Sequence, residues 1–117
     1  MSKSRWYTIV VDCHDINAVT SFWQAALGYE RVYEAPDEIV VVKDEETEPG
    51  LVFVTVPEDK TIKNRLHIDL APDDQAAEVQ RLVSLGATHV DVGQTDENKW
   101  VVLADPEGNE FCVLTAR

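Results

Sequence analysis

The sequence predicts an α+β fold in which a β-α-β-β-β module occurs twice in tandem. Two observations predict it. Each half of the chain shows a strand-like segment, then a helical pattern, then three further strand-like segments, in that order. The dipeptide Leu-Gly ends both helical patterns, at Leu27-Gly28 and at Leu85-Gly86. An internal duplication is the economical explanation.

The first half begins with a strand over residues 5–12, which are rich in β-branched and aromatic side chains. Asp15 is a candidate N-cap and Gly28 a candidate stop for the helix that follows. Apolar residues recur between them at helical spacing: Val19, Phe22, Trp23, Ala26 and Leu27. Three strands are expected next, at about 29–35, 38–43 and 51–56. The acidic Pro-Gly stretch before the last of them predicts an exposed connection.

The second half begins with strict polar and apolar alternation over residues 65–70, which predicts a strand. Asp73 or Asp74 is expected to cap a helix that ends at Gly86. Further strands are expected at about 87–92, 99–104 and 110–115. The alternation also assigns side chains to the two faces of the strand expected over residues 65–70. The side chains expected to pack on a helix are Leu66, Ile68 and Leu70, and those on the opposite face are Arg65, His67 and Asp69.

Length and composition predict one domain over residues 1–117, with modules at about 5–57 and 65–115. The hydrophobic content of 44% and charged content of 27% are typical of globular chains, which argues against disorder. The net charge of −12 argues against binding to nucleic acid or to an anionic membrane, because both need clustered cations. No signal-peptide pattern and no run of about 20 apolar residues occurs, so a cytoplasmic protein is expected. Cys13 and Cys112 are then expected to be free thiols.

Three segments together resemble a known family. They are Ser21–Tyr29 (SFWQAALGY), Arg65–Leu70 (RLHIDL) and Asp105–Phe111 (DPEGNEF). With these segments the chain resembles the vicinal-oxygen-chelate superfamily of glyoxalases, bleomycin-resistance proteins and dioxygenases, in particular its small glyoxalase-like domains. The resemblance implies a cup-shaped mixed sheet with helices outside, and assembly as a homodimer. Fold and chemistry are separable in such widely used scaffolds.

The resemblance also implies a divalent metal held by three or four His, Glu or Gln side chains. The corresponding positions fall on Thr8, on or near Val54, on His67 and on Cys112. Only His67 is of the expected type, so no metal cofactor is expected. His67 and Cys112, helped by Asp69 or Asp12, are the remnant candidates for a Zn²⁺ site. The alternative is a His67 that is hydrogen-bonded to Asp69, with Cys112 as a small cavity-lining side chain.

A metal-free site is a further interpretation of the same residues. His67 would act as acid or base, Asp69 would set its tautomer, and Arg65 would attract an anion. Against this, Arg65 and Asp69 could simply neutralise each other. Lys60 and Lys63 lie close to Arg65 in the sequence, and the three cations either steer an anionic metabolite or form a solvated loop.

The remaining ligand-binding candidates come from the same sheet faces. The full set is Arg65, Thr8, Trp6, Trp100, Cys112 and Leu114. Trp6 and Trp100 could stack on an aromatic ligand or serve plain packing. Trp23 is expected in the core or at a dimer interface, whereas His14 and His89 are expected to be exposed.

Three functions remain open at this stage. The first is binding of a small, anionic or aromatic metabolite in the cup. The second is a lyase, isomerase or dioxygenase that acts through His67 with an atypical metal or none. The third is a non-catalytic interaction scaffold. No nucleophile elbow, P-loop or dinucleotide fingerprint occurs in the sequence.

Overall fold

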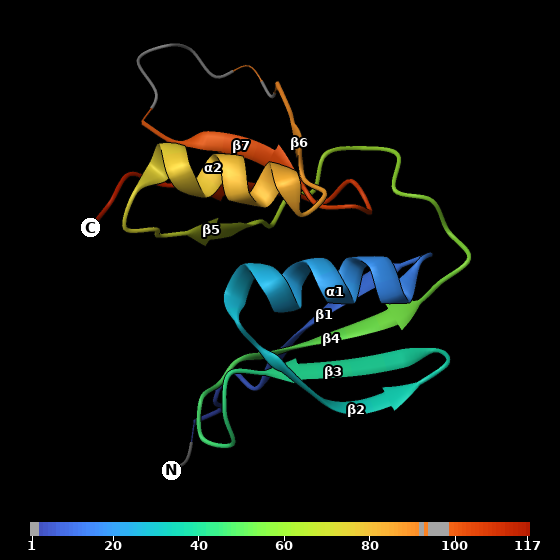
Figure 1. Cartoon of the computed structure of the whole chain (residues 1–117). Coiled ribbons are helices and arrows are strands. Elements are labelled where there is room, and N and C mark those ends of the chain that lie inside the picture. The colour runs from blue at the N-terminus through green and yellow to red at the C-terminus, as the bar shows by residue number, and fades with distance from the viewer. Residues whose placement is uncertain (1–2, 92, 94–98) are drawn as a thin grey trace. The chain divides into compact units, whose positions relative to one another are not determined.

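The computed structural model describes residues 3–91, 93 and 99–117 (Figure 1). The chain divides into two compact units, Met1–Asp59 and Lys60–Arg117. The two units have the same order of elements, and each is considered by itself below. Within the described ranges, no helix has the length and apolar character needed to cross a membrane.

The first unit is one helix and a four-stranded sheet. Its elements are β1 (Thr8–Cys13), α1 (Ile16–Leu27), β2 (Glu30–Ala35), β3 (Glu38–Val42) and β4 (Gly50–Thr55). The strand order is β1-β4-β3-β2. The first strand pairs in parallel with the last, and the other two pairs are antiparallel. The sheet is therefore mixed, as the sequence predicted.

Helix α1 begins and ends where the sequence indicated. The carboxylate of Asp15 accepts a hydrogen bond of 3.1 Å from the backbone N–H of Ala18, which satisfies one of the unpaired donors of the first turn. Gly28 ends the helix with φ of 73°, a left-handed conformation that favours glycine. The buried residues of the helix and of the neighbouring strands form the core, and they include Trp23: Ile16, Val19, Phe22, Trp23, Ile39, Val41, Leu51 and Phe53.

The second unit repeats the plan with shorter strands. Its elements are β5 (Ile68–Leu70), α2 (Gln75–Ser84), β6 (Thr88–His89), β7 (Val101–Ala104) and β8 (Glu110–Val113). The strand order β5-β8-β7-β6 is that of the first unit, and the first strand is again parallel to the last. Its fully buried side chains are Leu82, Leu103, Phe111 and Val113. The predicted α+β fold with a repeated β-α-β-β-β module is confirmed.

Two predictions about the strands of this unit were wrong. Strand β5 starts at Ile68 and not at Arg65, and Leu66 is 89% exposed although alternation assigned it to the packed face. Leu66 precedes the first residue of β5 that pairs with β8, so the ladder does not impose its alternation there. Strand β6 is also shorter than the predicted 87–92, and Val92 of that range lies outside the described residues.

The turn between β7 and β8 has its own internal support. Asp105 is buried, and one of its carboxylate oxygens accepts hydrogen bonds of 2.9 Å from the backbone N–H groups of Glu107 and Asn109. Gly108 of this turn adopts a positive φ of 85°, a conformation that favours glycine. The turn returns the chain so that β8 can pair with both β7 and β5.

The sequence offered both Asp73 and Asp74 as the N-cap of α2, and the structure identifies Asp74. Asp74 accepts a hydrogen bond of 3.0 Å from the backbone N–H of Ala77. We expect Asp74→Ala to lower the free energy of unfolding by about 1 kcal/mol, because it leaves that N–H without its partner. Asp73→Ala is the matched control and should cost about 0.5 kcal/mol or less. Urea denaturation followed by circular dichroism measures both, and equal losses would contradict the assignment.

Candidate functional site

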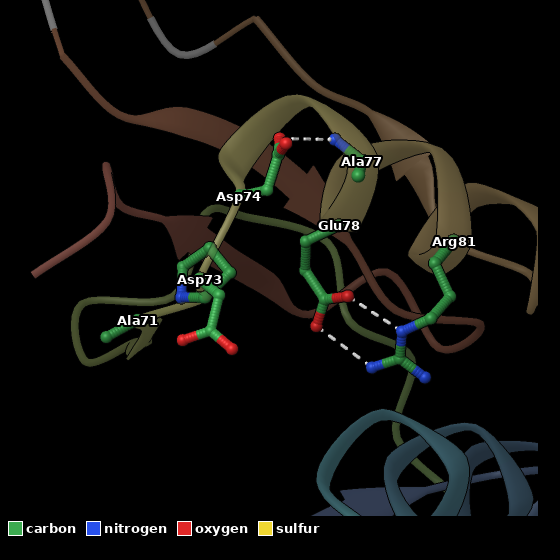
Figure 2. A pocket seen from close by; sticks show the side chains of 7 residues that line it. Ala71, Asp73, Asp74, Ala77, Glu78 and Arg81 are labelled. Carbon is green, nitrogen blue, oxygen red and sulfur yellow. Dashed lines mark hydrogen bonds and ion pairs between the residues drawn. The ribbon is translucent and has the colours of Figure 1, made fainter.

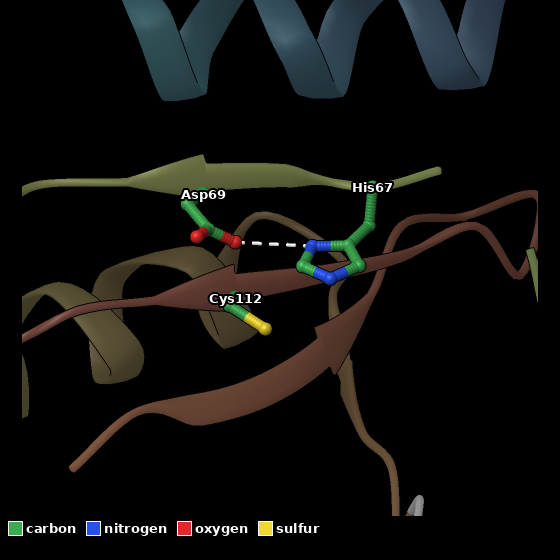
Figure 3. A group of neighbouring side chains, drawn as sticks. All are labelled: His67, Asp69 and Cys112. Atoms are coloured by element: carbon green, nitrogen blue, oxygen red, sulfur yellow. Dashed lines mark ion pairs between the residues drawn. The ribbon is translucent and has the colours of Figure 1, made fainter. Parts of the chain in front are cut away.

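Three chemically active side chains meet on one face of the second sheet. Asp69 lies on β5 and Cys112 on β8, and their Cα atoms are direct partners in the parallel ladder. His67 lies just before β5, and its side chain contacts that of Asp69. Figure 3 shows the three side chains projecting to the same side of these strands. Phe111 and Val113 are buried on the opposite face, and Cys112 and its ladder partner Val102 are buried on this one.

The imidazole of His67 is held by Asp69. Its Nδ1 atom lies 3.0 Å from Oδ1 of Asp69. In this contact the N–H group at Nδ1 of a neutral imidazole donates a hydrogen bond to the carboxylate. The lone pair of Nε2 is then available as a base. The side chains of His67 and Asp69 are 37% and 45% exposed, so a dissolved molecule can reach them.

Cys112 adds a buried thiol to this pair. One ligand atom from each of the three residues lies within 4.8 Å of the other two. Burial raises the pKa of the Cys112 thiol, and the charge and hydrogen bond of Asp69 raise it further, against a smaller opposing effect of Lys63. The group is therefore mainly a thiol at neutral pH and a weak nucleophile.

Glu110 positions the segment that leads into His67. Its carboxylate accepts hydrogen bonds of 2.9 Å from Nζ of Lys60 and 3.0 Å from the backbone N–H of Asn64. Burial alone would raise the pKa of Glu110, but these two partners outweigh it and the pKa is lowered. Sequence reasoning missed this residue, because nothing in the motif around it points to partners so distant along the chain.

Two further predicted ligand-binding residues adjoin the strands β7 and β8. Trp100 directly precedes β7 and Leu114 directly follows β8, at the end of the pair where Val101 faces Val113. Trp100 is 42% exposed and Leu114 is half-buried. The second unit thus has an exposed aromatic ring and an aliphatic side chain at the end of the strand pair that carries Cys112.

The predicted cations lie on the segment before β5. Arg65 is exposed, and within the described part of the chain it forms no ion pair, so the expected neutralisation by Asp69 is not seen. Lys60 is bound to Glu110, whereas Nζ of Lys63 donates only a 3.3 Å hydrogen bond to the carbonyl of Asn64 among the described residues. Lys63 and Arg65 therefore remain available to an anion.

The remaining candidates, Trp6, Thr8 and Val54, belong to the first unit. Trp6 is 67% exposed, and Thr8 is half-buried with a hydroxyl that has no hydrogen-bond partner among the described residues. Val54 lies on β4 between Asp12 and Glu38 in the ladder and offers no donor atom. The four positions implied by the resemblance therefore supply an alcohol, a hydrocarbon, an imidazole and a thiol. This set does not fit a centre built from three or four His, Glu or Gln ligands.

A separate hollow of about 400 Å³ lies at the start of α2 (Figure 2). Three of its four charged residues already serve the helix. Asp74 is the N-cap, and Arg81 binds Glu78 with hydrogen bonds of 2.7 and 2.9 Å. The hydrogen bond from Arg81 lowers the pKa of Glu78. Because these groups are engaged, the His67 face is the better candidate for chemistry.

Comparison with known proteins gives a consistent result. The family model of the Glyoxalase-like domain matches residues 8–114. No curated protein sequence matches the chain. A glyoxalase/bleomycin resistance protein/dioxygenase family enzyme from Burkholderia phytofirmans is 21% identical with a TM-score of 0.70, covering 94% of this chain and 97% of its own.

Two further solved structures have the same fold at lower identity. The fosfomycin resistance protein from Mesorhizobium loti is 15% identical with a TM-score of 0.72, and the match covers 100% of this chain and 95% of that one. The bleomycin-binding protein from Streptomyces verticillus, solved with copper(II)-bleomycin, is 18% identical with a TM-score of 0.62, and both chains are covered completely.

The environment of Cys112 predicts how its alkylation depends on pH. Since the thiolate is the reactive form and Asp69 raises the pKa, Asp69→Asn should move the half-maximal rate of reaction with iodoacetamide to lower pH. Lys63→Met should move it to higher pH, because Lys63 lowers that pKa. Mass spectrometry in a Cys13→Ser background follows Cys112 alone.

Lys43→Met is the matched control for the loss of a lysine charge, since Lys43 is not among the groups that shift the pKa of Cys112, and it should leave the profile in place. An unchanged profile in both Asp69→Asn and Lys63→Met would show that the arrangement of these groups around the thiol is wrong.

Proposed function

This chain belongs to the Glyoxalase-like domain family, and from that premise we propose that it binds a small organic anion or aromatic acid on the His67 face of the second unit. Binding does not use the family's usual divalent metal centre. The observation that carries the proposal is the composition of one sheet face. It combines the partly exposed His67–Asp69 pair with Cys112, and Trp100 and Leu114 adjoin the ends of the two strands β7 and β8.

The chemistry of this face suits a ligand with a flat apolar part and a polar end. An exposed indole offers a stacking surface, and aliphatic neighbours offer apolar contact. The imidazole can exchange a hydrogen bond with a polar group, since Asp69 fixes its orientation. Binding sites for small molecules typically combine such an apolar lining with a few placed polar groups.

Local charge supports an anionic ligand. The chain carries a net charge of −12, so its surface repels anions in general. Lys63 and Arg65 lie immediately before His67, and no carboxylate neutralises either of them in the part of the chain that the structure describes. The positive charges of Lys63 and Arg65 would therefore attract an anion to the neighbourhood of His67. The bleomycin-binding relative, described with its bound ligand, supports ligand binding by analogy of fold only.

Catalysis through His67 is the second candidate. The contact between Nδ1 and Asp69 favours it, because it leaves Nε2 as a base that could move a proton on a bound substrate. The activity would then be of the lyase, isomerase or dioxygenase type, in keeping with the superfamily. A protein that serves only as an interaction scaffold needs neither the contact between His67 and Asp69 nor a ligand-binding face. Assembly as a homodimer and a cytoplasmic location accompany both candidates as predictions from family membership.

A ligand screen tests the proposal directly. Reduced, EDTA-treated protein is screened by thermal shift against small carboxylates, phosphonates and heteroaromatic acids, and hits are titrated by isothermal calorimetry. We expect saturable binding that is unaffected by EDTA. His67→Ala and Trp100→Leu should each weaken it at least tenfold, because a contact worth about 1.4 kcal/mol changes affinity by that factor.

His14→Ala is the matched control, since His14 is also exposed and also faces a carboxylate, 3.5 Å away on Asp59. Hits whose affinity is insensitive to both site variants would contradict the proposed face, and the absence of any hit would favour the scaffold. Turnover that disappears in His67→Ala while affinity persists would establish the catalytic candidate.

A further inference from the structure

We propose that His67, Asp69 and Cys112 bind a single thiophilic divalent cation, foremost Zn²⁺, in a site built within the second unit alone (Figure 3). This centre differs from the one that the family implies. It uses a thiol and an aspartate in place of the His, Glu and Gln set, and it needs neither Thr8 nor Val54. The inference does not rest on the proposed function, because metal uptake can be measured without any organic ligand.

The geometry is close to that of a three-ligand zinc site. Zinc binds sulfur at about 2.3 Å and nitrogen or oxygen at about 2.0–2.2 Å, so donors around a tetrahedral ion lie about 3.3–3.7 Å apart. Here Nδ1 of His67 and Oδ1 of Asp69 are 3.0 Å apart, and the donor atoms of all three residues lie within 4.8 Å of one another. Side-chain adjustments of about 1 Å would bring the donors to bonding distances.

The strand pairing limits how much must move. Asp69 and Cys112 are Cα partners in the ladder between β5 and β8, so their side chains start side by side without any loop rearrangement. The segment before His67 is tied to β8 by the hydrogen bonds that Lys60 and Asn64 donate to Glu110. Only the partly exposed imidazole and carboxylate need to rotate.

The donor types determine which ion is preferred. Sulfur and imidazole nitrogen favour Zn²⁺ over the oxygen-seeking Mg²⁺ and Ca²⁺. Aspartate and thiolate together carry two negative charges, which balance the ion. Binding converts the Cys112 thiol to a thiolate and releases one proton, while the neutral imidazole shifts its own proton from Nδ1 to Nε2 and coordinates through Nδ1. No oxidant or reductant is needed.

The partial exposure of His67 and Asp69 provides both an entry path and a fourth coordination position. Zinc sites with three protein ligands hold water or another small ligand in that position. The buried sulfur forms the inner wall of the site, and the two partly exposed donors form its rim.

Cobalt spectroscopy tests the proposal on the full-length protein. The reduced protein is stripped with EDTA, freed of chelator, and titrated with Co²⁺ as a coloured substitute for Zn²⁺. We expect a sulfur-to-cobalt charge-transfer band in the near ultraviolet that saturates at one equivalent, together with the visible bands of tetrahedral Co²⁺. Zn²⁺ should abolish both, whereas Mg²⁺ should not.

The variants identify the ligands. Cys112→Ser should eliminate the charge-transfer band, and His67→Ala and Asp69→Ala should each weaken Co²⁺ binding at least tenfold. Cys13→Ser and His14→Ala are matched controls of the same residue types in the first unit and should bind as the wild type does. Circular dichroism shows whether each variant is folded.

The wild-type titration alone can overturn the proposal, whatever the variants do. Folded protein that shows no charge-transfer band at one equivalent of Co²⁺ would rule the site out, and so would a band that persists in folded Cys112→Ser. Either result would leave ligand binding at His67 untouched, since that is measured in EDTA-treated protein.

Discussion

The parallel pairing of the first and last strands of each unit is the constraint on which the rest depends. β1 pairs with β4 and β5 with β8, although a helix and two strands separate the partners in the chain. A parallel pair needs such a crossover, whereas the remaining neighbours are antiparallel and connect directly. The pairing of β5 with β8 also decides which side chains meet, because it places Asp69 beside Cys112. The same strand pairing that completes the second sheet therefore brings these two residues of the candidate site together.

Much of this architecture could be predicted from local chemistry. Asp15 and Gly28 define the ends of α1 because a cap and a left-handed stop are properties of a few neighbouring residues. The same holds for Gly108 in the turn before β8. The resemblance in the sequence identified His67 and Cys112 as remnants of one site, and the ladder brings them together with Asp69. The predictions of helix ends succeed because each depends on short-range geometry, whereas the role of His67 and Cys112 stays a prediction.

The errors have an equally physical origin. Alternation along residues 65–70 predicts a buried Leu66, but alternation has meaning only where a partner strand fixes the backbone, and the ladder starts at Ile68. Glu110 was missed because its role lies in what it binds, Lys60 and the backbone of Asn64, and sequence gives no signal of such contacts. The pairing of His67 with Asp69, and not of Arg65 with Asp69, is likewise decided by side-chain directions that sequence spacing leaves open.

The two units also show where a duplicated fold is free to diverge. In the first sheet, the row of partners Val10, Val52 and Val40 crosses three strands with one residue type. In the second, the row of Asp69, Cys112 and Val102 crosses the equivalent strands with a carboxylate, a thiol and a hydrocarbon. The opposite faces carry the buried residues Phe53 and Phe111 and cannot accept such changes without loss of packing. In the second unit the row that contains Asp69 also includes the buried Cys112 and Val102, so its polar donors lie directly beside packed groups. The two sheets thus keep the same strand order while the side chains of one row differ in chemistry.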